Sequence, residues 1–165
     1  MKYILYTLTL FSLSWAVVPE KAVVHIYKAQ RKLYILKGKD TLCNYKMVLG
    51  TNPVGDKMQE GDRKTPEGSF KLKSKYPHNT WNYFLWIDYP NAESYRKFNE
   101  RKRKHIIPQD AKIGGEVGIH GVPEDCDYLI DKGKDWTWGC ISLKNEQVKR
   151  VYELCAVGSG IIIYK

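Results

Sequence analysis

The sequence predicts a mostly β fold with helical cover, of the α+β class, in which the strands form a twisted β-sandwich. Short runs of alternating apolar and polar residues recur along the chain, and this alternation is typical of strands with one buried face. Turn-forming residues separate several of these runs. Two stretches have the composition or spacing of helices. Many short strands with few helices favour two packed layers around one core.

Seven strands are expected. In the first, Val24 and Ile26 alternate with more polar side chains. The turn sequence at 38–40 indicates a hairpin between the second and third strands. The polar, glycine-rich stretch Gly50–Gly61 is expected to be a loop. The predicted strands are Ala22–Lys28, Lys32–Lys37, Thr41–Leu49, Ser69–Lys75, Tyr83–Asp88, Val117–His120 and Gly160–Tyr164.

The first predicted helix, Asn91–Lys104, carries a dense run of basic residues. Such a run usually forms a solvated helix face, because charged side chains remain in water. The alternative is a mobile flap over a functional site, which would meet an anionic glycan or membrane surface. The basic residues are Arg96, Lys97, Arg101, Lys102, Arg103 and Lys104.

The second predicted helix lies near the C-terminus. Val148, Val151, Tyr152 and Cys155 follow helical spacing on one face. Cys155 lies on this apolar face, and we therefore expect it to be a core residue. Gly158 is expected to follow the end of the helix.

Residues 1–16 have the pattern of a signal peptide. Lys2 provides a positive charge before Tyr3–Leu13, which is nearly all apolar or hydroxyl-bearing, and small residues stand at Ser14 and Ala16. A first strand and a membrane anchor are the alternatives, but the apolar run is short for a spanning helix. We expect export to the periplasm or cell envelope.

The composition is that of one globular domain, expected over residues 22–165. Of the 165 residues, 43% are hydrophobic and 27% charged, which is ordinary for a globular protein. The net charge of +9, from 27 Lys+Arg and 18 Asp+Glu, favours anionic polymers or an anionic membrane or glycan surface as partners. Nucleic acid is not expected, because the chain contains no nucleic-acid-binding motif and carries an export signal.

The four cysteines allow three uses. Export permits a disulfide. If Cys140 is a nucleophile it must stay reduced, so at most one disulfide can form among Cys43, Cys126 and Cys155. A zinc site formed by His120, Cys126, Cys140 and Cys155 is the third use, but the spacings are long and irregular and no Cys-x-x-Cys pair occurs. We therefore expect no metal.

One histidine and one cysteine point to nucleophilic catalysis. Cys140 follows Gly139 in the predicted loop Gly133–Gly139, and His120 lies at the end of a predicted strand. A thiol and an imidazole can act as nucleophile and base. A glycine-containing turn can direct backbone N–H groups at a developing oxyanion. The alternative for His120 alone is a hydrogen-bonded core histidine.

The spacing of these residues resembles the L,D-transpeptidase catalytic domain (YkuD-like) family. Sixteen residues separate His120 from the segment Thr137-Trp138-Gly139-Cys140, and the match extends to Thr137, Gly139 and Cys140. The segment Gly61–Phe70 resembles the stretch that leads these domains into a central strand. The resemblance covers residues 22–164, nearly the whole predicted domain.

This resemblance implies cysteine-dependent acyl transfer on peptidoglycan stem peptides, in cell-wall cross-linking or remodelling, without a cofactor. Cys140 would attack the amide between an L-centre and a terminal D-residue, with His120 as base. The backbone carbonyl of Gly121 would orient His120, and the N–H groups of Gly139 and Cys140 would bind the oxyanion. Substrate contacts are expected from Thr137, Trp138, Ser142, Arg63, Lys64, His78 and Trp81.

Two departures from the family pattern leave the outcome of the reaction open. Trp138 stands where the family often has histidine, and Ser142 stands where it often has arginine or asparagine. Since Ser142 cannot pair with a substrate carboxylate as arginine does, an L,D-carboxypeptidase or amidase that hydrolyses the same bonds is an alternative. A non-enzymatic secreted cell-wall-binding module would explain the charge and the aromatic residues, but not the spacing of His120 and Cys140.

Overall fold

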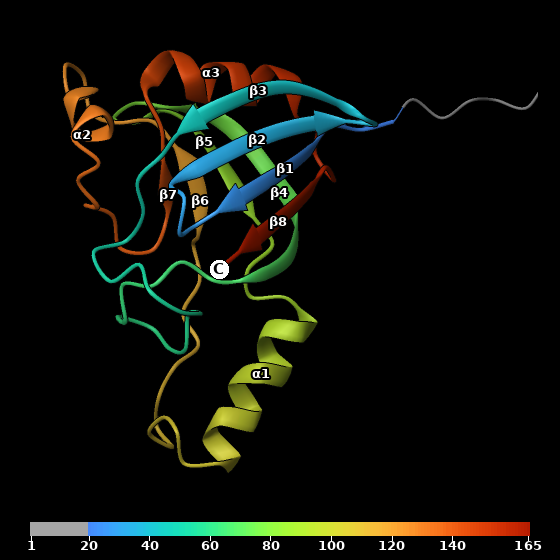
Figure 1. The fold of residues 1–165 in the computed structure, drawn as a ribbon. Coiled ribbons are helices and arrows are strands. Elements are labelled where there is room, and N and C mark those ends of the chain that lie inside the picture. Colours follow the sequence, from blue (N-terminus) through green and yellow to red (C-terminus); the bar gives the residue numbers. More distant parts are fainter. Residues whose placement is uncertain (1–19) are drawn as a thin grey trace, which may run out of the picture.

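The computed structural model describes residues 20–165, so the predicted signal peptide lies outside the described residues (Figure 1). In this part of the chain, eight strands form one hydrogen-bonded sheet in the order β3-β2-β1-β8-β4-β5-β6-β7. Their bounds are β1 Val23–Tyr27, β2 Lys32–Lys37, β3 Asp40–Lys46, β4 Gly68–His78, β5 Asn82–Ile87, β6 Gly118–His120, β7 Ile141–Ser142 and β8 Gly160–Tyr164.

The long strand β4 joins the two halves of the sheet. Its first part, from Gly68 to Lys71, pairs with β8, and its later part, from Leu72 to His78, pairs with β5. The register with β5 shifts between Leu72 and Ser74, and such an irregularity bends a strand and increases its twist. The sheet therefore curls, and its two halves form the two layers that were predicted as a sandwich.

The curled sheet is almost closed, because its two edges meet just beyond β3. Val48 and Ser142 exchange two backbone hydrogen bonds, at 3.0 and 2.9 Å. Gly50 forms a further bridge with Thr137. These contacts bring the segment after β3 against the predicted loop that directly precedes Cys140.

The main core fills the space inside the curl. Val24 and Ile26 of β1 are buried, as their alternation predicted, and they share one apolar cluster with Leu85 of β5 and Ile141 of β7. Helix α3 (Asn145–Leu154) adds Val148 and Val151 to this cluster, and Cys155, which follows the helix, is only 1% exposed. The prediction that Cys155 is a core residue is confirmed.

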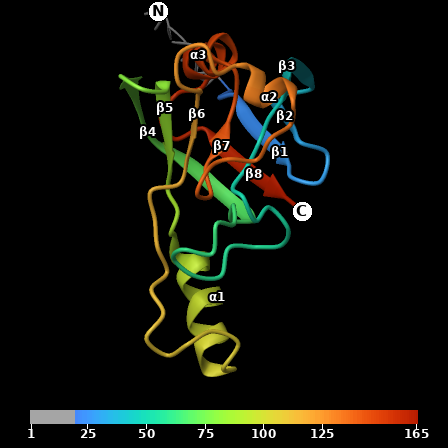
Figure 2. The same cartoon turned by 90° about the vertical axis from the view of Figure 1, so that its left-hand side faces the viewer.

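Helix α1 (Ala92–Arg103) extends away from the sheet, at the bottom of the view in Figure 1, and Figure 2 shows the same separation from the side. Its only buried residue is Phe98. The loop between β3 and β4 lies beside it, and residues 104–117 return from it to β6. None of the helices between Glu20 and Lys165 combines the length and apolar character needed to cross a bilayer.

The mostly β class with helical cover is confirmed, and the predicted elements agree with the observed ones to within a few residues. Two short elements were not predicted: α2 (Tyr128–Asp131) and β7, which has two residues. The described chain thus has three helices rather than two. Both missed elements are too short to show a periodic pattern in the sequence.

Candidate active site

His120 is held rigidly at the end of β6. Its Nδ1 lies 2.6 Å from the carbonyl oxygen of Gly121. A carbonyl oxygen only accepts hydrogen bonds, so Nδ1 must carry the proton and Nε2 must hold the free lone pair. The ring stacks on Trp81 at 4.5 Å and on Phe84 at 5.9 Å. The predicted contact between His120 and the Gly121 carbonyl is therefore present, in the tautomer that a base requires.

The Gly121 carbonyl is itself fixed by its surroundings. Ser142 donates its hydroxyl hydrogen to the same oxygen at 3.1 Å. A side chain at position 121 would collide with its neighbours, because a Cβ there would lie 2.3 Å from Asn145 Oδ1 and 2.6 Å from the Trp81 carbonyl oxygen. Glycine is thus required at this position by close packing.

Ser142 does not contact the space that a substrate would occupy. Its side chain is fully buried, since the residue is 0% exposed and pairs with His120 across β6 and β7. The expectation that Ser142 binds substrate is therefore corrected. The sequence could not show this, because the pairing of β6 with β7 turns Ser142 towards Gly121 rather than towards solvent.

Thr137 shapes the turn that carries the cysteine. Its Oγ1 donates to the Cys140 carbonyl oxygen at 2.7 Å and accepts from the Gly139 N–H at 3.2 Å. Gly139 has φ of +131°, and a Cβ there would lie 2.7 Å from the Lys64 carbonyl oxygen. Thr137 is only 3% exposed, so its main contacts are with the turn itself.

This geometry changes the expected set of oxyanion donors. The Gly139 N–H is already engaged by Thr137 Oγ1, whereas no acceptor within residues 20–165 takes the Cys140 N–H. Of the two predicted donors, only the Cys140 N–H is free to bind an oxyanion in this conformation.

Cys140 and His120 line one cavity of about 830 Å³. The Cys140 thiol donates to the Glu116 carbonyl oxygen at 3.6 Å. Three segments form the walls of the cavity: the loop between β3 and β4, the return from α1, and the turn that carries Cys140. Residues from them include Lys57, Arg63, Glu116, Trp136 and Trp138.

Burial favours the uncharged forms of both His120 and Cys140. It lowers the pKa of His120 to about 4, with the nearby Gly121 carbonyl opposing the shift. It raises the pKa of the Cys140 thiol to about 11, against the opposing effects of the Gly118 backbone and the Lys57 charge. At neutral pH the site therefore holds a thiol beside a neutral imidazole rather than a preformed thiolate.

The remaining predicted substrate residues are distributed around this cavity. Trp81 lines it, directly beside His120. His78 stacks on Trp81 at 4.5 Å and is not part of the cavity wall. Lys64 directs its ammonium group to the Val54 carbonyl oxygen and is also outside the wall.

Arg63 and Trp138 form a pair at the edge of the cavity. The Arg63 guanidinium lies 3.7 Å from the centre of the Trp138 ring, in a cation–π contact. Trp138 is 75% exposed, which is unusual for so large an apolar side chain. Both residues are thus available to a ligand.

The structure separates the other cysteines from the site. All four cysteines are free thiols. Within residues 20–165, no three His, Cys, Asp or Glu side chains gather in a way that would hold a metal ion. The zinc arrangement considered from the sequence is therefore not formed by the described residues.

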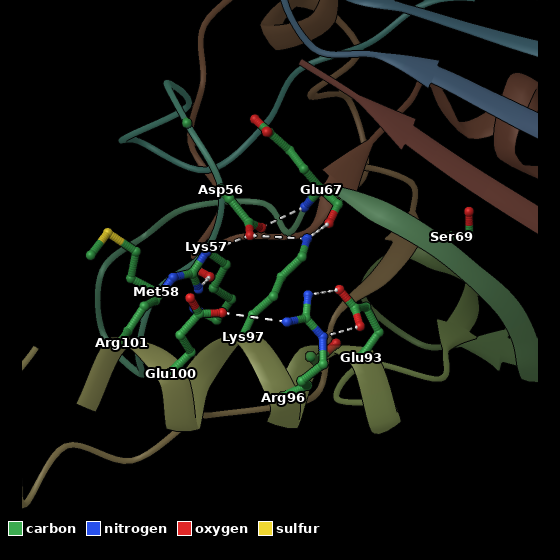
Figure 3. Close-up of polar contacts among 12 residues, drawn as sticks. Asp56, Lys57, Met58, Glu67, Ser69, Glu93, Arg96, Lys97, Glu100 and Arg101 are labelled. Carbon is green, nitrogen blue, oxygen red and sulfur yellow. Dashed lines mark hydrogen bonds and ion pairs between the residues drawn. The ribbon is translucent and has the colours of Figure 1, made fainter. Parts of the chain in front are cut away.

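Four of the six residues in the basic run of α1 make ion pairs, and they share three carboxylates. Arg101 contacts Asp56 at 2.6 Å, Lys97 contacts Asp56 at 3.4 Å, and Lys104 contacts Glu100 at 2.7 Å. Arg96 pairs with two glutamates of its own helix. Figure 3 shows how Arg101 and Lys97 join α1 to the loop between β3 and β4. Much of this charge therefore has a structural role rather than forming a free basic surface.

The structure resembles several solved proteins. It aligns with the helical cell shape determining protein Pgp2 from Campylobacter jejuni at 25% identity and a TM-score of 0.64, covering 88% of this chain and 48% of that one. Bd1075 from Bdellovibrio bacteriovorus gives 19% identity and a TM-score of 0.62, again over 88% and 48%. A mutant L,D-transpeptidase from Enterococcus faecium gives 15% identity and a TM-score of 0.56, over 88% and 50%.

This chain spans about half the length of those structures. No curated protein sequence matches it. The YkuD profile, which describes the L,D-transpeptidase catalytic domain, matches residues 21–163. That match covers almost the whole described chain, including the cavity with His120 and Cys140, and the chain therefore belongs to the L,D-transpeptidase catalytic domain family.

Proposed function

We propose that this protein is an L,D-transpeptidase that uses Cys140 for acyl transfer on the stem peptides of peptidoglycan. The observation that carries the proposal is the position of His120 in the wall of the same cavity as Cys140, with Nδ1 bonded to the Gly121 carbonyl. This arrangement leaves Nε2 as the basic atom. The family match supports the same chemistry.

In the first half of the proposed reaction, Cys140 Sγ attacks the amide carbonyl carbon between an L-centre and a terminal D-residue. His120 Nε2 takes the thiol proton as the C–S bond forms, so that no free thiolate is needed beforehand. The Cys140 N–H donates to the oxyanion of the tetrahedral intermediate. His120 then returns the proton to the leaving amine, the C–N bond breaks, and a thioester remains.

In the second half, an acceptor resolves the thioester. The acceptor is the amine of a second stem peptide or of a D-amino acid. Its nitrogen attacks the thioester carbon while His120 Nε2 takes a proton from it. The C–S bond then breaks, and His120 returns the proton to Cys140 Sγ. Transfer to such an amine would cross-link or remodel the cell wall. The similarity to a cell shape determining protein supports a role in the cell wall and in cell shape.

Hydrolysis of the same bonds, as by an L,D-carboxypeptidase or amidase, is the second candidate. One observation favours it: Ser142 is fully buried and donates its hydroxyl to the Gly121 carbonyl, so it cannot hold an acceptor. Transfer requires a positioned amine, whereas water is always present. Transfer would then depend on other residues of the cavity wall to position the acceptor amine.

A cell-envelope location follows from the proposed substrate and from the predicted signal peptide at residues 1–16. N-terminal sequencing of the native protein should give a start near Val17. An intact Met1 in a soluble cytoplasmic fraction would contradict export.

The function is tested by digesting purified peptidoglycan with the wild type and with Cys140→Ala, followed by mass analysis of the muropeptides. We expect the wild type to convert tetrapeptide stems into cross-linked, exchanged or tripeptide products, and Cys140→Ala to leave them unchanged. Cross-links or exchange would indicate a transferase, and tripeptides alone a hydrolase. Sacculus binding without any conversion would instead favour the non-enzymatic binding module.

A further inference from the structure

Lys57 is a charged residue in the wall of the catalytic cavity, and no motif in the sequence pointed to it. The residue is only 6% exposed, yet it lines the same cavity as His120 and Cys140. Lysine is rarely buried unless its ammonium group has partners, because removing the charge from water is costly. The positive charge of Lys57 also lowers the pKa of Cys140, which places it within electrostatic reach of the nucleophile.

The ammonium group of Lys57 has one more donor than it uses. It donates to Asp62 Oδ1 at 2.8 Å and to the Gln59 carbonyl oxygen at 3.1 Å. An ammonium group carries three N–H donors. Within residues 20–165 no third acceptor is present, so one N–H of this cavity-lining residue has no partner among the described residues.

Asp62 does not depend on Lys57 to stay in place. Its carboxylate also accepts backbone N–H groups from Met58, Gln59 and Lys64, at 2.6, 3.1 and 3.0 Å. Burial raises the pKa of Asp62, but these bonds and the one from Lys57 together lower it, so the carboxylate stays ionised. Asp62 thus serves as a fixed support that orients Lys57.

The backbone at Lys57 is fixed from the other side by α1. Arg101 donates to the Lys57 carbonyl oxygen at 2.7 Å and to Asp56 Oδ2 at 2.6 Å, as Figure 3 shows. Asp56 in turn accepts the Glu67 N–H at 2.8 Å. These contacts hold the loop against α1, so that the position of Lys57 in the cavity wall is preorganised.

The other charges of the cavity wall differ from Lys57 in their surroundings. Glu60 and Glu116 are exposed, and water screens their charges. The guanidinium of Arg63 lies over the exposed Trp138 ring. Lys57 is therefore the buried cation that an anionic group near Cys140 would meet.

We propose that Lys57 binds the carboxylate of the D-residue next to the scissile amide. This proposal rests on the proposed function. The carboxylate of that residue is separated from the amide nitrogen by one carbon, so it must lie close to Cys140 when the amide is attacked. The same residue leaves during acylation, and a D-amino acid acceptor would occupy the same place in exchange. Lys57 would therefore select for a terminal carboxylate in both half-reactions.

The test uses two tetrapeptide donors that differ only at the last carboxyl group, one with a free carboxylate and one with a carboxamide. The rate of thioester formation per donor concentration is measured by intact mass for the wild type, Lys57→Met and Lys57→Arg. Lys134→Met, at an exposed position outside the cavity, is the matched control. Near-ultraviolet circular dichroism checks that each variant is folded.

We expect the wild type to prefer the carboxylate donor, and Lys57→Met to lose about ten- to a hundredfold of its rate with that donor. Lys57→Met should react with the carboxamide donor nearly as fast as the wild type does. Lys57→Arg should keep part of the preference for the carboxylate donor, and Lys134→Met should keep all of it.

The proposal is overturned if the folded Lys57→Met variant loses activity equally with both donors. If Lys57→Met does not fold, the proposal is tested on the wild type alone. Equal acylation rates of the wild type with the carboxylate and carboxamide donors would overturn it. Absence of a thioester with either donor in the wild type would instead contradict the proposed function itself.

Discussion

Burial shifts the pKa values of the two proposed catalytic residues in opposite directions, and the shifts can be measured. It raises the pKa of Cys140 to about 11 and lowers that of His120 to about 4. The site therefore holds a protonated thiol at neutral pH.

The first prediction therefore concerns alkylation. Iodoacetamide reacts with the thiolate, which becomes abundant only as the pH approaches the raised pKa of the folded protein. Modification of Cys140 should be slow at pH 7 and should keep rising above pH 9. Peptide mass spectrometry at Cys140 across this range gives the profile. A rate that is already constant below pH 7 would indicate a thiolate–imidazolium pair.

The second prediction concerns Ser142, whose hydroxyl donates to the Gly121 carbonyl. Ser142→Ala should lower the free energy of unfolding by about 1 kcal/mol, because one buried hydrogen bond is lost while His120 still uses the carbonyl. Ser142→Arg should lower it by several kcal/mol, since it would bury an unpaired charge. Urea unfolding measures both. A stable Ser142→Arg variant with higher transfer activity would restore the substrate-binding interpretation.

The same residues show what a sequence can and cannot predict. The contact between His120 and the Gly121 carbonyl could be predicted, because the spacing of His120 and Cys140 resembles the family pattern and that resemblance implies the contact. The inward direction of Ser142 depends on the pairing of β6 with β7. The position of Lys57 in the cavity wall depends on its hydrogen bonds with Asp62 and Arg101. Asp62 lies in the same irregular loop and Arg101 lies in a helix far along the chain, so no sequence pattern connects them with Lys57.

At the level of elements, strands with clear alternation could be predicted closely, and β2 has the predicted bounds Lys32–Lys37. Helix α1 differs from its prediction by one residue at each end. Its composition did not show that Lys97 and Arg101 pair with Asp56, since the partner lies in a loop some 40 residues earlier. The basic run was therefore interpreted as a solvated face or a flap.

The third prediction follows from these ion pairs. Asp56→Asn should weaken the attachment of α1 to the loop that carries Lys57, because the carboxylate loses its charge towards Arg101 and Lys97. We expect faster amide hydrogen exchange in α1 and in residues 56–63, with no change in α3, and a loss of about 1–3 kcal/mol in stability.

The matched control is Glu93→Gln, which removes an exposed ion pair on the same helix. Exposed pairs contribute little, so this variant should exchange like the wild type. Equal exchange in Asp56→Asn and Glu93→Gln would mean that the network does not hold α1 in place.

For the whole molecule, the central feature is the closure of the curled sheet. The bonds between Val48 and Ser142 bring the two ends of the strand order together, and the bridge from Gly50 to Thr137 continues this contact. As a result, Cys140 and His120 lie in the wall of one cavity. The class of fold could be predicted from the sequence. The closure of the sheet could not, because it depends on two isolated β-bridges, and a single bridged residue pair produces no periodic pattern in the sequence.

The central claim is that Cys140 forms a thioester with the donor peptide while His120 takes the proton. The most direct measurement is the intact mass of the protein after brief incubation with a tetrapeptide donor. The wild type should gain the mass of the tripeptide acyl group at Cys140, Cys140→Ala should gain none, and His120→Ala should acylate far more slowly. Donor turnover by Cys140→Ala at the wild-type rate would contradict the account.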